Sequence, residues 1–500
     1  MITPSKETFL SLLQAGRVPP LYEEISYSSP ACMYEVFESP KSFLLESVKG
    51  PENIARYSFL GFDPCLSLTV KNALIDLECG GKHKTLVSNQ PLKALKHLVS
   101  HYRQAPFENL PPFQGGLVGL FSYDFVQYFE RLPKNAVDDL DLPDAHFFMF
   151  HKLISFDHKE KRCWILVCPG VEEALGEDGA LRQGDRSEQY DRAASEIERI
   201  RKAVVREYPS DDRTDAKFGV RDPGKKIDIV YEMKKEDYMD AVRRAKEYIA
   251  AGDIFQANLS QRLSSDVGKR RAWSLYRTLR DINPSPFAAY MDLGDYQIVC
   301  SSPERLIRVK GGAIETRPIA GTRPRGKDRG EDETMRRELL LNEKERAEHI
   351  MLIDLERNDL GRVSAYGSVV VDELMITEDY SHVIHIVSNV TGHLADGKDC
   401  FDAVRAAFPG GTITGVPKVR CMEIIDELEP VRRGPYTGSI GYIGFSESMD
   451  LNIVIRTFLI KDGSAYVQAG AGIVADSDPE REYFETLKKA EALIKTLGAV

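Results

Sequence analysis

Short apolar stretches, interrupted by glycine and proline, dominate the chain up to about residue 165. Segments such as SFLLESV, RYSFLGF and CWILVCPG have the length and composition of buried strands with turns between them. The sequence then becomes polar and rich in turn residues between positions 171 and 226, where one charged amphipathic helix is expected over residues 187–206. We interpret this stretch as a linker between an N-terminal region, residues 1–170, and a larger region, residues 227–500.

Helices and strands alternate irregularly in residues 227–500. Several predicted strands follow one another directly, which favours antiparallel pairing and an α+β class over regular βαβ units. Helices are predicted over residues 235–251 and 331–356, near His382, and from Pro417 and Pro479. Strands are predicted near residues 256–263, 287–291, 297–301, 306–310 and 368–371, and in the segments GSIGYIGF, LNIVIRTFLI and AYVQAGAGIV.

Composition and charge narrow the classes of function. The chain has 500 residues, 42% hydrophobic and 29% charged, as in an ordinary folded protein. We expect neither a membrane span nor a zinc site, because no apolar run is long enough and the eight cysteines form no Cys-x-x-Cys pair. Reduced thiols indicate a cytoplasmic location. The net charge of −11 disfavours nucleic acid and anionic membranes, so an anionic small substrate would need local cationic or N–H groups or a metal ion.

Two pairs of glutamates recur at helical spacing. Glu345 and Glu348 lie in NEKERAEHIMLIDL, and Glu482 and Glu485 lie in DPEREYFETLKKA. A spacing of three residues places both carboxylates of a pair on one face of a helix. If the two faces met, the four carboxylates would require a hard divalent cation, above all Mg2+. The alternative is that both pairs are solvated surface charges.

Glycine-rich and basic segments add candidate groups for an anion. GGTITGVPK is not a phosphate loop, because it lacks the required Lys-Ser/Thr. It leads into the helix at Pro417, and it is either an anion site formed by the free N–H groups of the helix start or an ordinary glycine turn. Gly470 and Gly472 in QAGAGIV allow the backbone to approach a ligand or a neighbouring strand closely. Arg456, at the end of an apolar strand, needs a protein carboxylate or an anionic ligand. His385 fits a buried, hydrogen-bonded histidine, and no nucleophile can be tied to it.

Six long segments, in this order, resemble the chorismate-utilising enzymes: PIAGTRPRG, ERAEHIMLIDLERNDLGRV, FPGGTITGVPKVRCMEIIDELEP, GPYTGSIGYIGF, NIVIRT and AGAGIVADSDPEREYFETLKKA. The resemblance covers essentially all of residues 227–500, and SFLLESV, ARYSFLGFDP and FQGGLVGLFSYD are similar to the first region of these enzymes. Within the family the chain looks most like the large component, component I, of aminodeoxychorismate synthase and anthranilate synthase. The resemblance implies large antiparallel sheets packed as a sandwich, with helices outside and the active cleft beside the sheet core.

The resemblance also implies roles for individual residues. Glu304 in SSPER is expected to be the general acid at the departing hydroxyl, and His385 is expected to lie beside the ring. The positions implied for the chorismate site are Gln256, Ala320, Thr412, Tyr436, Arg456, Gly470, Ala471, Gly472 and Lys489, and those implied for Mg2+ are Glu345, Glu348, Glu482 and Glu485. Because chorismate is a dianion, cationic side chains, N–H groups and Mg2+ suit it chemically.

Ammonia is the nucleophile that the resemblance favours. Gln256 in GDIFQANLSQR stands where the water-using relatives, isochorismate and salicylate synthases, usually have a lysine. Ala320 stands where many aminodeoxychorismate synthases have a lysine that attacks the ring, so ammonia would attack directly. The chain has no cysteine in a Gly-x-Cys-x-Gly context, and the resemblance therefore implies a separate glutamine amidotransferase subunit as partner.

Two activities fit this pattern. FQANLSQR, NPSPFAAY, YTGSIGYIGF and LNIVIRT look more like aminodeoxychorismate synthase, and we expect amination of chorismate to 4-amino-4-deoxychorismate. Ala320 is shared with anthranilate synthases, which form anthranilate and pyruvate, and that activity is the alternative. The LLES motif resembles the tryptophan site of inhibited anthranilate synthases, with Glu46, Ser47, Pro286 and Phe287 as candidate residues. Phe287 and Ala288 stand where those enzymes more often have Tyr-Met.

Overall fold

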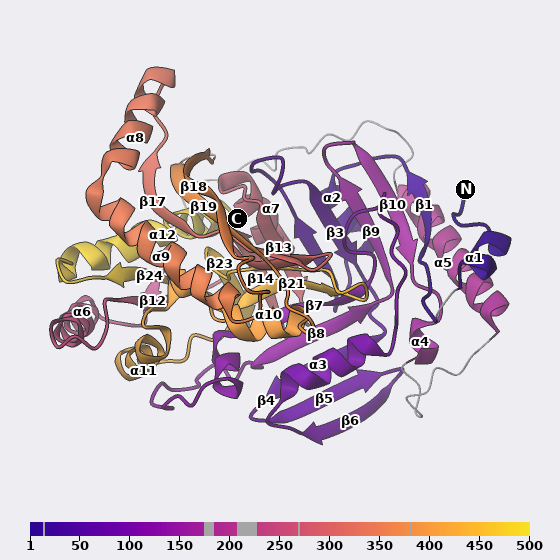
Figure 1. Cartoon of the computed structure of the whole chain (residues 1–500), viewed down its shortest axis with the longest axis horizontal. Helices are drawn as coiled ribbons and strands as arrows, with labels where there is room; N and C mark the ends of the chain where they lie inside the picture. Colours follow the sequence, from indigo (N-terminus) through magenta and orange to yellow (C-terminus); the bar gives the residue numbers. More distant parts are fainter. Residues whose placement is uncertain (14–15, 175–184, 208–227, 269–270, 381–382) are drawn as a thin grey trace.

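Two large antiparallel sheets packed face to face form the body of the protein, with helices around them (Figure 1). The computed structural model describes residues 1–13, 16–174, 185–207, 228–268, 271–380 and 383–500. The architecture is the α+β sandwich that the sequence predicts. In the described ranges, the helices are all too short or too polar to cross a bilayer.

The strand order of each sheet does not follow the sequence. The first sheet runs β1 (Leu21–Ile25), β10 (Arg162–Val167), β9 (Lys152–Asp157), β3 (Tyr57–Gly61), β2 (Phe43–Glu46), β13 (Phe287–Asp292), β14 (Tyr296–Ser302), β23 (Thr457–Lys461), β24 (Ser464–Ile473), β12 (Gln256–Asp266) and β11 (Val230–Tyr231), with β20 (Gly415–Val416) beside β12. The second runs β17 (Ile319–Pro324), β19 (Val383–His393), β16 (Ala313–Thr316), β15 (Arg305–Lys310), β22 (Met449–Asn452), β21 (Ser439–Gly444), β7 (Gly116–Phe121), β8 (Ala145–Phe150), β4 (Leu66–Lys71), β5 (Leu74–Cys79) and β6 (Lys82–Val87), with β18 (Val370–Asp379) beside β19.

Helices surround the sandwich. They are α1 (Lys6–Leu12), α2 (Pro30–Phe37), α3 (Pro91–Ser100), α4 (Val171–Ala174), α5 (Arg186–Glu207), α6 (Lys235–Ala250), α7 (Ala272–Ile282), α8 (Arg329–Leu341), α9 (Glu343–Gly361), α10 (Cys400–Ala407), α11 (Lys418–Leu428) and α12 (Pro479–Ala499), with the 3-10 turns η1 (Tyr123–Tyr128) and η2 (Gly411–Ile413). The helix predicted over residues 187–206 is confirmed as α5.

Each sheet combines strands from the N-terminal and the C-terminal region. In the first sheet β2 pairs with β13, and in the second β7 pairs with β21. Aromatic side chains of both sheets meet in the interface, where the rings of Phe43 and Phe150 lie 4.7 Å apart in an edge-to-face contact. The two regions therefore share one core. The boundaries of the polar linker remain a prediction, because residues 175–184 and 208–227 lie outside the described part of the chain.

Two predicted helical segments compare differently with the structure. The helical stretch expected over residues 331–356 is confirmed, but it is divided into α8 and α9, because the Asn342 side chain accepts a hydrogen bond from the N–H of Glu345, at 3.0 Å, and so caps the start of α9. The helix expected near His382 is instead strand β19, whose apolar side chains pack in the second sheet. His382 itself lies outside the described residues.

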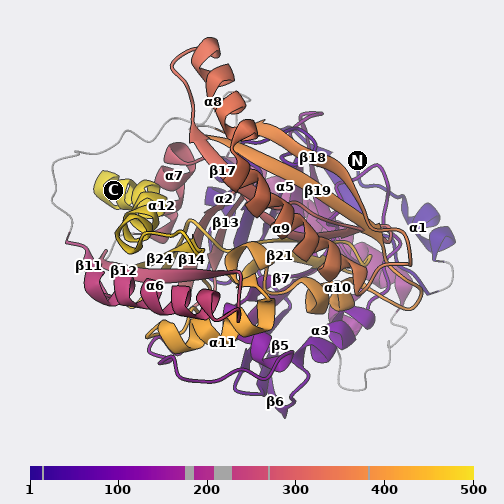
Figure 2. The same ribbon diagram turned by 60° about the vertical axis from the view of Figure 1, so that its left-hand side comes forward.

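The C-terminal helices bring distant segments to one end of the first sheet. Helices α6, α11 and α12 lie against β12 and β24 in Figure 2, and α9 lies against β17 and β19. Helix α12 begins at Pro479 as predicted, with the Asp478 side chain accepting from the N–H of Arg481 at 2.9 Å. Pro417 is the N-cap of α11 and lies one position before its first residue. The starts of α9 and α12, which carry the glutamate pairs, thus flank the same part of the fold.

Candidate active site

The centre of the site is formed where the chain crosses between the two sheets. One crossing leads from β14 to β15 through Glu304, and the other leads from β22 to β23 through Arg456. The crossings are tied together, since the N–H of Ile453 donates to the Glu304 carbonyl at 3.0 Å and the N–H of Ser301 donates to the Arg456 carbonyl at 3.2 Å. Two residues separated by about 150 positions are thereby held as neighbours.

Glu304 is a buried carboxyl with few compensating contacts. Its side chain is 5% exposed, and its Oε1 accepts a hydrogen bond from Thr412 Oγ1 at 2.9 Å. Burial raises its pKa from 4.5 to about 7, against the smaller opposing effects of Thr412, the Ile319 N–H, Arg456 and Lys489. A carboxyl group of this kind carries a proton in a large fraction of molecules at neutral pH. Glu304 is therefore suited to general acid catalysis, as the sequence predicts.

Arg456 places a positive charge near Glu304 that forms no ion pair within the described residues. Its backbone has a φ of 52°, in the left-handed region, and its side chain is half-buried at the crossing. Across the described residues its guanidinium forms no ion pair or hydrogen bond, and burial lowers its pKa. Since an uncompensated guanidinium is costly in such a place, the arrangement is suited to an anionic ligand.

His385 is a neutral imidazole with one free nitrogen. It lies on β19, 3% exposed, with Nδ1 2.9 Å from Thr322 Oγ1 and 3.3 Å from the Gly321 carbonyl. The carbonyl can only accept, so we assign the proton to Nδ1 and a lone pair to Nε2, which is buried without a hydrogen-bond partner among the described residues. Burial, with a contribution from Arg456, lowers its pKa to about 3. The ring also packs edge-on against Tyr380 at 5.1 Å.

The floor of the site is a glycine-lined stretch of β24. A Cβ at Gly470 would lie 2.4 Å from Asn258 Oδ1 and 2.8 Å from the Tyr436 hydroxyl, so only glycine fits there. A Cβ at Gly472 would lie 2.4 Å from Gln256 Nε2. The remaining predicted substrate residues adjoin this floor or its walls: Ala471 turns its side chain into the core beneath β24, Lys489 Nζ donates to the Gly470 carbonyl at 3.0 Å, and Ala320 lies on β17, which pairs with the strand of His385.

The first glutamate pair faces this floor from α9. Glu348 Oε1 accepts from Gln256 Nε2 at 2.9 Å, on the side of Gly472. Glu345 Oε1 is paired with Arg323 at 2.6 Å, and its Oε2 is buried without a hydrogen-bond partner in the described part of the chain. One carboxylate oxygen of the pair is thus available to a ligand.

The second pair, on α12, is more exposed. Glu485 is paired with Lys489 at 2.9 Å, while Glu482 is half-buried, and burial raises its pKa. Carboxylate oxygens are the donors that Mg2+ prefers, and the unpaired oxygen of Glu345 fits this role. In the ranges that the structure describes, however, no three acidic, histidine or cysteine side chains are grouped as a metal site. The donors fit Mg2+ in kind, and their convergence on one ion remains a prediction.

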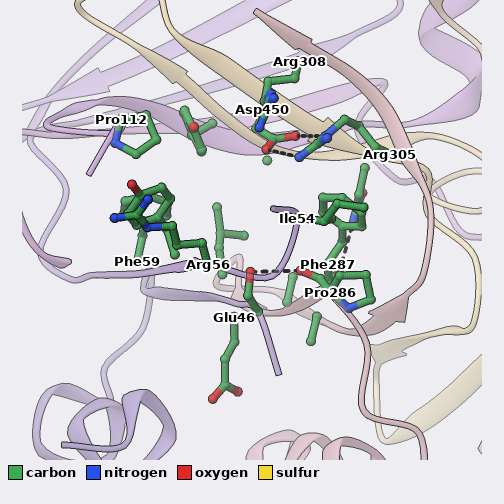
Figure 3. A pocket seen from close by; sticks show the side chains of 18 of the residues that line it. Glu46, Ile54, Arg56, Phe59, Pro112, Pro286, Phe287, Arg305, Arg308 and Asp450 are labelled. Carbon is green, nitrogen blue, oxygen red and sulfur yellow. Dashed lines mark hydrogen bonds and ion pairs between the residues drawn. The ribbon is translucent and has the colours of Figure 1, made fainter. Parts of the chain in front are cut away.

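A separate cavity of about 620 Å³ lies between the two sheets (Figure 3). It is lined by all four residues predicted for a tryptophan site, Glu46, Ser47, Pro286 and Phe287. The Glu46 carboxylate points away from the cavity, because it accepts hydrogen bonds from Tyr276 and Arg280 of α7 at 2.7–2.9 Å.

The cavity adjoins the site of Glu304. Arg305, the next residue in the chain, lines the cavity and binds Asp450 with Nε 2.9 Å from the carboxylate (Figure 3). It also pairs with Glu315 at 2.5 Å. A ligand in the cavity would therefore contact a residue covalently attached to the candidate acid.

Three site residues escaped the site prediction. Asn258 lies in the quoted FQANLSQR motif, two positions after Gln256 on β12, and its Oδ1 is buried without a partner among the described residues. Side chains two positions apart in a strand lie on the same face, so the prediction of Gln256 could have been extended to Asn258. Thr322 and Tyr380, which orient His385, come from segments that meet only through the pairing of β17 with β19 and the packing of β18 beside them. Sequence spacing carries no signal for such contacts.

Comparisons with known proteins identify the family of the chain. The fold and the site define a chorismate-utilising enzyme, and the chain matches the chorismate binding enzyme family over residues 41–495. The protein belongs to this family, as a large subunit. It is 44% identical to anthranilate synthase component 1 of Acetivibrio thermocellus over 472 residues, 94% of this chain and 92% of the relative.

Relatives of the same similarity carry a second activity. The chain is 44% identical to aminodeoxychorismate synthase component 1 of Bacillus subtilis (strain 168) over 454 residues, 91% of each chain. Among solved structures, anthranilate synthase component I from Streptococcus pneumoniae TIGR4 superposes with a TM-score of 0.73 at 35% identity, covering 88% of this chain and 92% of that one. The family and the fold are thus shown, and the relatives divide between anthranilate synthases and aminodeoxychorismate synthases.

Proposed function

We propose that the protein is component I of an aminodeoxychorismate synthase, which replaces the 4-hydroxyl of chorismate with an amino group. The observation that carries the proposal is Glu304, a buried carboxyl with a pKa of about 7, beside the Arg456 guanidinium that lacks a counter-ion among the described residues. Loss of a hydroxyl from a dianionic ring requires a proton donor and an anion site in one place. The alternative is anthranilate synthase component I, which shares the alanine at Ala320 and would eliminate pyruvate.

The proposed reaction assigns each proton to a residue. Arg456 and Lys489 bind the substrate carboxylates, and Glu304 donates its proton as the ring C4–O bond breaks, so that water leaves. Ammonia forms the C–N bond with its lone pair. The new ammonium group then returns a proton to the Glu304 carboxylate, while neutral His385, whose Nε2 can accept a hydrogen bond, lies beside the ring. Neither Gln256 nor Ala320 can serve as a base or nucleophile, which supports direct attack by ammonia.

Ammonia would come from a partner. The names of the relatives contain "component 1", and we propose that this chain likewise receives ammonia from a glutamine amidotransferase subunit in the cytoplasm. Ammonium salts would replace that partner in a test with the isolated chain.

Product analysis distinguishes the two activities. Purified protein is incubated with chorismate, Mg2+ and an ammonium salt, with and without an added aminodeoxychorismate lyase. We expect p-aminobenzoate only when the lyase is present. Fluorescent anthranilate released together with pyruvate, in the absence of lyase, would overturn the proposal and establish the alternative.

Mg2+ is proposed to bind through Glu345, Glu348, Glu482 and Glu485, where it would neutralise a substrate carboxylate. We expect that a chelator abolishes turnover, and that Glu348→Gln raises the Mg2+ concentration for half-maximal rate by at least about tenfold. The measurement is a Mg2+ titration of initial rates. Glu338→Gln, which alters an exposed carboxylate on α8, is the matched control and should leave the titration unchanged. A Glu348→Gln protein with the full Mg2+ response would remove Glu348 from the metal site.

The inter-sheet cavity is proposed to bind tryptophan. The Ser47 hydroxyl donates to the Pro286 carbonyl at 3.1 Å across its rim, and leucine at this position would remove the bond and fill space. Tryptophan at 100 times its Kd should stabilise the wild type by roughly 2.7 kcal/mol, seen as a higher Tm. Ser47→Leu should lose this stabilisation, while Ser11→Leu, on the exposed face of α1, keeps it. A wild-type Tm unaffected by tryptophan would show that the cavity has another ligand or none.

A further inference from the structure

Glu356 is a second buried carboxyl near Glu304 that the reaction above does not use. It lies on α9 and is 3% exposed. A Cβ at Gly411 would lie only 3.4 Å from Glu356 Oε1, so the carboxyl packs directly beneath the turn that carries Thr412. Thr412 in turn donates its hydroxyl to Glu304. One turn of η2 therefore separates the two carboxyls.

Glu356 forms no ion pair with a basic side chain among the described residues. The groups that face it are Asp359 on the same helix, Lys418 at the start of α11 and Glu304 at the sheet crossing. Lys418 is paired with Asp359, and Glu356 Oε2 is buried without a hydrogen-bond partner among the described residues. Burial, with Asp359 and Glu304 adding repulsion, raises the pKa of Glu356 to about 8, against the opposing effects of Lys418 and Thr316.

We propose that Glu356 is a positioning residue that must stay uncharged for the enzyme to act: as a neutral acid it supports the Gly411–Thr412 turn on which the hydrogen bond to Glu304 depends. This inference rests on the proposed role of Glu304. Ionised, Glu356 would place a second negative charge under Glu304 and close to the site of a dianionic substrate. Ionisation of Glu356 would therefore weaken substrate binding and disturb the position of Thr412. Glu356 itself takes part in no chemical step.

The enzyme should lose activity as pH rises, because Glu304 and Glu356 must both be protonated for it to act. As pH rises, Glu304 loses its proton near pH 7 and Glu356 near pH 8, so the pair titrates in two steps. Above the second step, kcat/KM of the wild type should fall about 100-fold per pH unit, because two protons are lost. Glutamine is neutral at every pH, so Glu356→Gln should fall only about tenfold per pH unit while remaining active at pH 7.

The experiment measures kcat/KM for chorismate around pH 9, at a fixed concentration of uncharged ammonia and saturating Mg2+. Asp354→Asn, an exposed carboxylate on the same helix, is the matched control and should keep the wild-type slope. Equal slopes in wild type and Glu356→Gln would overturn the inference. If the wild type does not consume chorismate at all, the proposed function fails, which is a different outcome.

Infrared spectroscopy tests the same inference without turnover and without the Glu356 variant. In Glu304→Gln protein, where residue 304 no longer repels Glu356, we expect the C=O band of one protonated carboxylic acid to disappear as pH is raised, at a pH below the wild-type value of about 8. Absence of any such band at pH 7 would overturn the inference, because Glu356 would then be ionised at the pH where the enzyme works.

Discussion

Replacing Glu304 by glutamine is expected to lower kcat by about 10²–10⁴, with a much smaller change in KM. Glutamine keeps the shape of the side chain and can still bind Thr412, but it cannot transfer a proton to the leaving hydroxyl. The wild-type rate should also fall as pH rises through about 7, because the acid form of Glu304 is lost, and this step should be absent from the residual activity of the variant. Initial rates of chorismate consumption across pH measure both effects.

Glu338→Gln, on the exposed side of α8, is the control for the loss of a carboxylate as such and should behave as wild type. A Glu304→Gln protein with wild-type kcat would exclude Glu304 as the acid. The burial that raises its pKa would then be a feature of the sheet crossing alone.

Replacing Arg456 by methionine is expected to separate activity from stability. The guanidinium forms no ion pair in the described part of the protein, so we expect its partner to be a substrate carboxylate. Loss of a desolvated charge pair of this kind costs about 2–5 kcal/mol, which corresponds to roughly 30- to 5,000-fold in kcat/KM. Methionine removes an uncompensated charge from a half-buried position, and Tm should therefore stay the same or rise.

Arg456→Lys tests the geometry of the same contact. Lysine keeps the charge but cannot bind a carboxylate with two parallel hydrogen bonds, so we expect an intermediate loss of kcat/KM. A methionine variant that unfolds at markedly lower temperature would contradict this view, because Arg456 would then stabilise the protein itself.

Much of the fold could be predicted because its signals are local. The short apolar stretches and the glycine and proline positions correspond to strands and turns, and Asp478 before Pro479 marks the start of α12. The helical stretch predicted over residues 331–356 is present, but its break at Asn342 was not predicted, because densely charged residues surround it, although Asn342 is a good N-cap residue. The helix expected near His382 failed because a strand in a shared sheet depends on partners distant in the sequence.

The candidate site was predicted mainly through motifs, and the structure adds the burial and the long-range contacts of its residues. Motif resemblance identified Glu304, Arg456 and His385, and the structure brings all three to the sheet crossings and β19. Their burial, and hence the raised and lowered pKa values, comes from long-range packing. Glu356 could have been noticed from the sequence, since it shares a helix face with the apolar Leu352 and Ile353. Its contact with the η2 turn could not.

The measurement that tests the central claim most directly uses chorismate, Mg2+ and ammonium labelled with heavy nitrogen, followed by mass spectrometry of the products. The account predicts that chorismate is consumed only when ammonium is present, that the product carries one labelled nitrogen, and that Glu304→Gln nearly abolishes its formation. Unchanged chorismate, or a product without nitrogen formed equally well in the absence of ammonium, would contradict it.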